Sequence, residues 1–222
     1  MKNKIVFPFF IAFSLLYVLL IFFNQETITW YFKPLLVPFL FFLVWNYNSF
    51  VEKKWLLYGL LFSWIGDLLL MFVDKNELFF ITGLFSFLTA HFFYLYLFIK
   101  QKKLYKTSKN ISFWFAVLLV VAYLGSIMYL LFPKLGSLKI PVTIYAFTIS
   151  TLLLLGFKVY FGWKNKAAQF VLIGAIAFVL SDSLLAINKF YNPIEKASFW
   201  IMSTYIIAQT FIVIGILRLN KK

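Results

Sequence analysis

Long apolar segments alternate with short polar links along the whole chain. Each segment is close to the ~20 residues that an α-helix needs to cross the hydrocarbon core of a bilayer. The segments cover residues 5–23, 32–50, 55–73, 78–99, 111–132, 138–160, 167–187 and 199–219. They are too long and too uniformly apolar for barrel strands, and a helix satisfies its own backbone in lipid. The pattern therefore predicts an all-α membrane protein: a single bundle of eight transmembrane helices over residues 1–222.

Composition agrees with this architecture, because 64% of the residues are hydrophobic and only 13% are charged. A soluble domain cannot cover that much apolar surface with so few polar groups, so lipid must be the solvent. The first apolar segment has no small-residue cleavage site after it, and we expect it to be a retained span rather than a signal peptide. The expected location is the cell membrane, as a multi-pass protein, and the inner membrane if the source is bacterial.

Basic residues set the expected orientation. If the N-terminus is cytoplasmic, most of the 21 lysines and arginines fall on the cytoplasmic side, with the densest cluster from Lys100 to Lys109. The exceptions are Lys33, Lys75, Lys134, Lys139, Lys189 and Lys196. We therefore predict that both termini are cytoplasmic.

The net charge of +14 does not indicate nucleic acid as a partner. The lysines lie between apolar blocks and form no basic face on a soluble module. We expect them to meet membrane lipids instead. The sequence leaves the oligomeric state open.

Three ionisable side chains lie well inside the predicted spans: Asp67, His91 and Asp182. Placing an aspartate there costs at least ~2.5–3.5 kcal/mol, and such residues usually face the bundle interior and mark a functional path. At ~1.5 Å per residue, both aspartates lie roughly 18–23 Å from the inner ends of their helices. We therefore expect them to meet in one polar pocket in the outer half of the membrane.

Further polar residues are expected in the same pocket. Tyr205 and Gln209 are spaced i, i+4 and share a helix face. Ser181, Ser183 and Asn188 surround Asp182 in the sequence. These serines could also simply bond carbonyl groups one turn back.

Other interpretations of the embedded residues stay open. The aspartates could be structural links between helices. A metal site could use His91 with both aspartates, although no local ligand spacing supports it, and we expect no metal. A serine–histidine–aspartate triad is formally available, but it lacks a G-x-S-x-G elbow.

A proton- or ion-coupled transporter of small molecules or lipids is the main functional alternative, since embedded aspartate and histidine also carry ions. A non-catalytic lipid-binding protein is the third class. Transporters often contain inverted repeats and broken helices. Here the weak internal echo, GLFSFLTAH (Gly83–His91) against GAIAFVLSD (Gly174–Asp182), is parallel.

The polar elements together resemble the YhhN-type lysoplasmalogenase family of eight-helix membrane proteins. The matching segments are FKPL (Phe32–Leu35), IGDLLLMF (Ile65–Phe72), GLFSFLTAHFFYLYLF (Gly83–Phe98), GAIAFVLSDSLLAIN (Gly174–Asn188) and STYIIAQTFIVIG (Ser203–Gly215). The resemblance implies a hydrolase that cleaves the vinyl ether bond of lysoplasmalogens. Its products would be a fatty aldehyde and a glycerophospho-alcohol, such as glycerophosphoethanolamine or glycerophosphocholine. A lysoplasmenyl-type lysophospholipid is the implied substrate, and no cofactor is expected.

Two buried carboxyl groups suit this chemistry. A vinyl ether is protonated at carbon to give an oxocarbenium-like cation, and glycosidases divide two carboxylates around a related cation. We expect Asp67 and Asp182 to form the acid/base pair, with His91 as the third catalytic residue. The expected substrate-binding residues are Lys33, as a point charge for the phosphate, together with Tyr94, Ser181, Ser183, Asn188, Tyr205 and Gln209.

Overall fold

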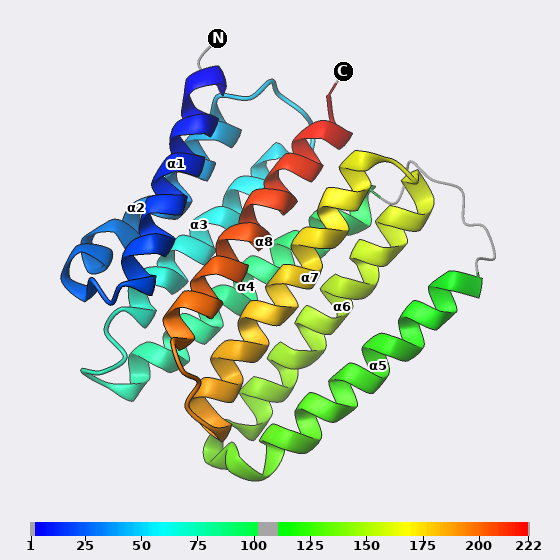
Figure 1. Cartoon of the computed structure of the whole chain (residues 1–222). Helices are drawn as coiled ribbons and strands as arrows, with labels where there is room; N and C mark the ends of the chain where they lie inside the picture. The colour runs from blue at the N-terminus through cyan, green and yellow to red at the C-terminus, as the bar shows by residue number, and fades with distance from the viewer. Residues whose placement is uncertain (1–2, 102–110, 222) are drawn as a thin grey trace. The chain divides into compact units, whose positions relative to one another are not determined.

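The computed structural model describes residues 3–101 and 111–221, and within these residues the chain forms eight α-helices (Figure 1). They are α1 (Asn3–Phe22), α2 (Glu26–Trp45), α3 (Lys53–Leu70), α4 (Glu77–Gln101), α5 (Ile111–Leu131), α6 (Lys139–Trp163), α7 (Lys166–Ala186) and α8 (Ala197–Leu219). Two short 3₁₀ turns, Phe132–Lys134 and Gly136–Leu138, precede α6, and the π-helix η4 (Ile187–Tyr191) follows α7. The predicted all-α class is confirmed.

The chain divides into two compact units, residues Met1–Leu97 and Phe98–Lys222. Unit 1 contains α1 to α3 and most of α4, and unit 2 contains α5 to α8. The prediction of a single domain over residues 1–222 stays a prediction.

Seven of the helices in the described ranges are long and apolar enough to cross a membrane, which supports a multi-pass membrane protein. The exception is α3, whose 18 residues include Lys53 and Lys54 in the first turn and Asp67 in the interior. The eighth span and the cytoplasmic position of the termini stay predictions. Most of the basic cluster from Lys100 to Lys109 lies outside the described residues.

The prediction for α2 was wrong at both ends, because the helix covers Glu26–Trp45 rather than residues 32–50. Glu26 in the first turn favours an earlier start, since a negative charge suits a helix N-terminus. At the other end, Lys53 Nζ donates to the carbonyl groups of Trp45 and Tyr47, both at 2.7 Å. These bonds satisfy carbonyl groups where the helix stops.

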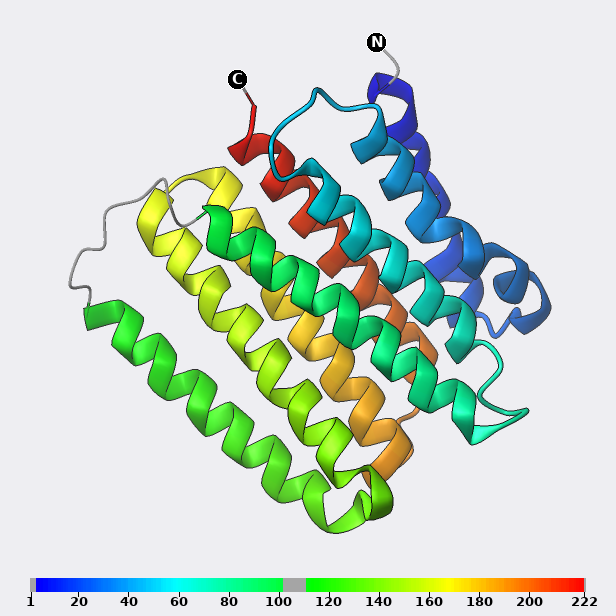
Figure 2. The same ribbon diagram turned by 180° about the vertical axis from the view of Figure 1, so that it is seen from behind.

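In unit 1, α1 packs on α2 and α2 packs on α3. Glycines bring α3 close to α4: a Cβ added at Gly59 would lie 2.4 Å from the Tyr94 ring, and one at Gly66 would lie 2.6 Å from the Phe87 ring. The two pairs run in opposite directions along the chain, so α3 and α4 are antiparallel, as Figure 2 shows. This register places the polar residues of the two helices relative to each other.

A proline in α2 is compensated by a tryptophan from α3. Pro38 has no N–H, so the carbonyl of Pro34 loses its partner one turn later in the helix. Trp64 Nε1 donates to this carbonyl at 2.8 Å. In lipid nothing else would satisfy it, so the indole fixes α3 against α2.

We expect Trp64→Phe to lower the free energy of unfolding by about 1–3 kcal/mol, because the ring is kept while a buried acceptor loses its donor. The measurement is thermal unfolding in detergent. Trp114→Phe is the matched control, since Trp114 is exposed on α5. Equal shifts in the two variants would contradict this account.

In unit 2, α7 and α8 pack backbone to backbone. A Cβ at Gly174 would lie 2.8 Å from the nitrogen of Ile212, and one at Gly215 would lie 2.8 Å from the nitrogen of Val171. Small residues permit this approach between membrane helices. α6 packs on α7, and α5 packs on α6 at the edge of the unit (Figure 1).

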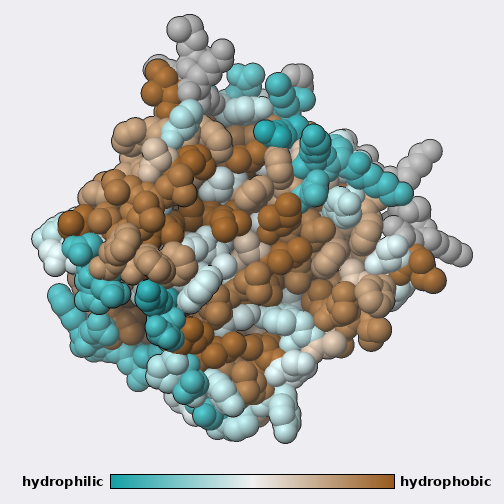
Figure 3. Space-filling model, viewed as in Figure 1, coloured by the Kyte–Doolittle hydropathy of each residue, from teal (hydrophilic) through white to brown (hydrophobic). Residues whose placement is uncertain are grey.

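Apolar side chains cover much of the outside of the helices. Large hydrophobic residues of α5, such as Trp114, Phe115 and Leu118, are exposed. Figure 3 shows hydrophobic residues along the helices and hydrophilic residues gathered at helix ends. This distribution is typical of a protein whose solvent is lipid.

Candidate functional site

Asp67 is the polar centre of unit 1. Its exposed fraction is 3%, and Ser63, one turn earlier on the same face of α3, is also buried. The charge of Asp67 acts on Lys33 of α2 and on Tyr17 of α1. Three helices of unit 1 therefore bring polar groups towards this carboxyl group.

His91 of α4 is fully buried, with an exposed fraction of 0%. Its Nδ1 lies 2.6 Å from the carbonyl oxygen of Phe87, which can only accept. Nδ1 therefore carries the proton, and Nε2 is the acceptor of the neutral ring. The tautomer suits a histidine that accepts a hydrogen bond from water or a hydroxyl group.

The α3–α4 register relates His91 to Asp67. Gly59 faces Tyr94 and Gly66 faces Phe87, so His91 lies at the level of Phe62, between one and two helical turns from Asp67. The predicted substrate residue Tyr94 is fully buried against Gly59. Unit 1 thus collects Lys33, Asp67, His91 and Tyr94 from the predicted set.

In unit 2, the S-D-S triplet of α7 connects to neighbouring helices. Successive helical residues point about 100° apart, so the three side chains face different neighbours. Ser181 donates to the carbonyl of Ile201 on α8 at 3.0 Å. Asp182 accepts through Oδ2 from the hydroxyl group of Tyr145 on α6 at 2.9 Å.

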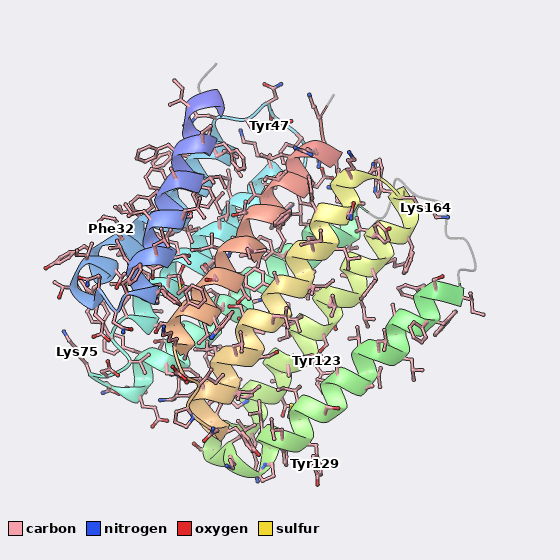
Figure 4. All side chains as sticks on the ribbon, viewed as in Figure 1. Phe32, Tyr47, Lys75, Tyr123, Tyr129 and Lys164 are labelled. Carbon is pink, nitrogen blue, oxygen red and sulfur yellow. The ribbon has the colours of Figure 1, made fainter. Side chains whose placement is uncertain are left out.

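Ser183 connects α7 to α5. Its hydroxyl group donates to the carbonyl of Val179 at 2.5 Å and is hydrogen-bonded to the Tyr123 hydroxyl group. A serine has one hydroxyl hydrogen and a carbonyl can only accept, so Tyr123 donates to Ser183. Figure 4 labels Tyr123 on α5 beside the other helices of the unit, whereas Tyr129 is 87% exposed. Both serines of the triplet use their hydrogens within the protein, so a substrate would meet them only as acceptors.

Tyr205 and Gln209 share a buried face of α8, where Gln209 Nε2 donates to the Tyr205 hydroxyl group at 3.3 Å. The Tyr205 ring meets Phe178 of α7 edge to face. Asn188 has a different position, because it lies in η4 and its Oδ1 accepts the N–H of Ile194 at 2.9 Å. It fixes the loop that leads into α8.

Three tyrosines, Tyr17, Tyr123 and Tyr145, are polar neighbours of the aspartates that the sequence did not predict. Tyr145 binds Asp182 directly, and the charge of Asp182 also acts on Tyr123. In unit 1 the charge of Asp67 acts on Tyr17 in the same way. A tyrosine in an apolar helix is an ordinary residue of core or interface, so only the structure distinguishes these from the others.

Asp67 and Asp182 belong to different units, so their meeting in one pocket stays a prediction. Over residues 3–101 and 111–221, no three histidine, aspartate or glutamate side chains come together in a way that could hold a metal ion.

Apolar helices that carry an aspartate with polar neighbours in each unit define a multi-pass membrane protein with embedded polar sites. The chain belongs to the YhhN family, which it matches over residues 28–216. This range includes all of the predicted site residues.

Two curated relatives are similar to the chain. Human lysoplasmalogenase TMEM86A is 32% identical over 168 residues, which cover 71% of this chain and 62% of the human protein. Lysoplasmalogenase TMEM86A from Bos taurus is 29% identical over 167 residues, with the same coverage. The chain therefore aligns with less than two thirds of the length of these relatives. No solved structure matches.

Proposed function

We propose that this protein is a membrane hydrolase that cleaves the vinyl ether bond of lysoplasmalogens. The observation that carries the proposal is the pair of aspartates inside apolar helices of a YhhN-family chain, each with polar neighbours. The name of the TMEM86A relatives, lysoplasmalogenase, supports a hydrolase over the transporter alternative. The proposed products are a fatty aldehyde and a glycerophospho-alcohol.

Asp67 and Asp182 act as the acid/base pair in this proposal. One carboxylic acid gives its proton to the vinyl carbon that does not bear oxygen, which leaves an oxocarbenium-like cation. The other, as a carboxylate, stabilises the cation and takes a proton from the water that adds to it. The hemiacetal then collapses: its hydroxyl proton is lost, the carbon–oxygen bond to glycerol breaks, and the glycerol oxygen takes up a proton.

Other residues have supporting roles in the proposal. His91 accepts a hydrogen bond through Nε2 and helps to orient water or the glycerol hydroxyl group. Lys33 is partly buried about two turns into α2, and it binds the phosphate there as a point charge. Tyr94, Ser181, Ser183, Asn188, Tyr205 and Gln209 remain the proposed substrate contacts.

The test is an assay of the purified protein with lysoplasmenylethanolamine, with acyl lysophosphatidylethanolamine of the same chain length as the matched control. We expect equal amounts of fatty aldehyde and glycerophosphoethanolamine from the vinyl ether lipid only, measured by mass spectrometry. In D₂O the aldehyde should carry one deuterium on the carbon next to the carbonyl, because protonation occurs at carbon. Absence of aldehyde, or equal cleavage of the acyl lipid, would contradict the proposal.

A further inference from the structure

We infer that Tyr145 is a positioning residue for Asp182, and that its hydroxyl group holds the carboxyl group in the orientation that the reaction needs. The inference deepens the proposed function and depends on it. Tyr145 lies in α6, outside the polar segments that resemble the family, so no sequence pattern indicated it.

The contact between Tyr145 and Asp182 is direct and sheltered. The hydroxyl group donates to Oδ2 at 2.9 Å, and the exposed fraction of Tyr145 is 7%. Tyrosine has few rotatable bonds, so ordering it costs less entropy than ordering a long flexible donor. α6 packs on both α5 and α7, which gives the hydroxyl group a rigid support.

The two serines beside Asp182 place its backbone, and Tyr145 contacts its carboxyl group. Ser181 is tied to α8 and Ser183 to α5, so the rotation of α7 about its axis is fixed on both sides of the aspartate. The backbone of Asp182 is therefore placed by its neighbours. Its carboxyl group is held at Oδ2 by the bond from Tyr145.

Accurate placement of the carboxyl group matters for catalysis, since an error of about 1 Å in a reacting group can lower a rate by about 10²-fold. The hydroxyl group also acts on charge. Hydrogen bonds to an ionised acceptor are about twice as strong as those between neutral groups. Tyr145 therefore supports Asp182 most during the steps in which the carboxyl group has given up its proton.

Tyr123 offers a matched comparison within the same unit. The charge of Asp182 acts on it as well, but its hydroxyl group donates to Ser183 rather than to the carboxyl group. Tyr123→Phe and Tyr145→Phe each delete one hydroxyl group that is hydrogen-bonded to α7. Only Tyr145→Phe removes a bond to Asp182.

The experiment measures kcat, KM and the melting temperature of both variants with lysoplasmenylethanolamine. For Tyr145→Phe we expect kcat to fall by about 10- to 100-fold with KM changed by less than about threefold, because placement rather than binding is lost. For Tyr123→Phe we expect a smaller fall in kcat than for Tyr145→Phe, because the substitution removes the tie of Ser183 to α5 but no bond to Asp182. In an Asp182→Asn background, Tyr145→Phe should cause no further loss, because it acts through the aspartate.

The outcomes separate this inference from the proposed function. If the wild-type protein releases no aldehyde, the proposed function fails and the inference fails with it. If the wild type is active but Tyr145→Phe keeps its kcat, or costs as much in the Asp182→Asn background, only the inference is overturned.

A second variant tests the inference if Tyr145→Phe does not fold. A fluorotyrosine at position 145 keeps the ring and the hydroxyl group but makes the group a more acidic donor. We expect a changed kcat at an unchanged melting temperature. An unchanged kcat would overturn the inference.

Discussion

Asp182→Asn is expected to lower kcat by about 10²–10⁴-fold, the usual contribution of a general acid or base. Asparagine has nearly the same shape and still offers an oxygen to the Tyr145 hydroxyl group, so the fold should be kept. It cannot give or take the proton that the vinyl ether reaction requires. Aldehyde release from a lysoplasmalogen by the purified variant is the measurement.

Asp67→Asn should cause a loss of similar size, and the double variant should be little worse than either single one, because residues that act as a unit are not additive. Asp74→Asn is the matched control, since Asp74 is exposed after α3. Wild-type kcat in either folded single variant would remove that aspartate from the acid/base pair.

Gly174→Leu is expected to cost more than about 3 kcal/mol of stability, above the usual range for overpacking, because the obstacle is backbone that cannot change rotamer. An added Cβ would lie 2.8 Å from the nitrogen of Ile212 and 3.0 Å from the carbonyl oxygen of Ala208. The variant should lose its monodisperse peak in size-exclusion chromatography and unfold at a lower temperature.

Gly125→Leu is the control for this prediction. Gly125 lies in α5, and nothing among the described residues is within 4 Å of a Cβ added there. The substitution should leave the melting temperature almost unchanged. Similar losses for both glycines would mean that the added leucine side chain itself, rather than the approach of α7 to α8, determines the effect.

The helices could be predicted from the sequence because hydrophobicity alone selects segments that cross lipid. The C-terminal end of α2 could not be predicted, because it depends on local hydrogen bonds. Lys53, from the next helix, donates to the carbonyl groups of Trp45 and Tyr47. The hydrogen bond from Trp64 to the carbonyl of Pro34 could not be predicted either. Pro38 only indicates that this carbonyl lacks its helical donor. A proline in the sequence shows that a backbone hydrogen bond is missing, but only the structure shows which residue supplies the donor instead.

The candidate site follows the same division. Asp67, His91 and Asp182 could be identified because charge in an apolar helix is costly wherever it points. Tyr145 could not be identified from the sequence, because a tyrosine is an ordinary residue in a core or at an interface. Asn188 was indicated by its proximity in sequence to Asp182, and its Oδ1 accepts the N–H of Ile194, while its place in the substrate pocket stays a prediction.

The π-helix η4 has a consequence for the path of the chain. Its closing bond runs from the N–H of Asn192 to the carbonyl of Ile187, five residues earlier, so this turn contains one residue more than an α-helical turn. The surplus residue rotates everything after it by about 100° relative to a continuous α-helix. Shortening this segment by one position would leave Asp182 where it is, while turning the entry to α8 towards a different side.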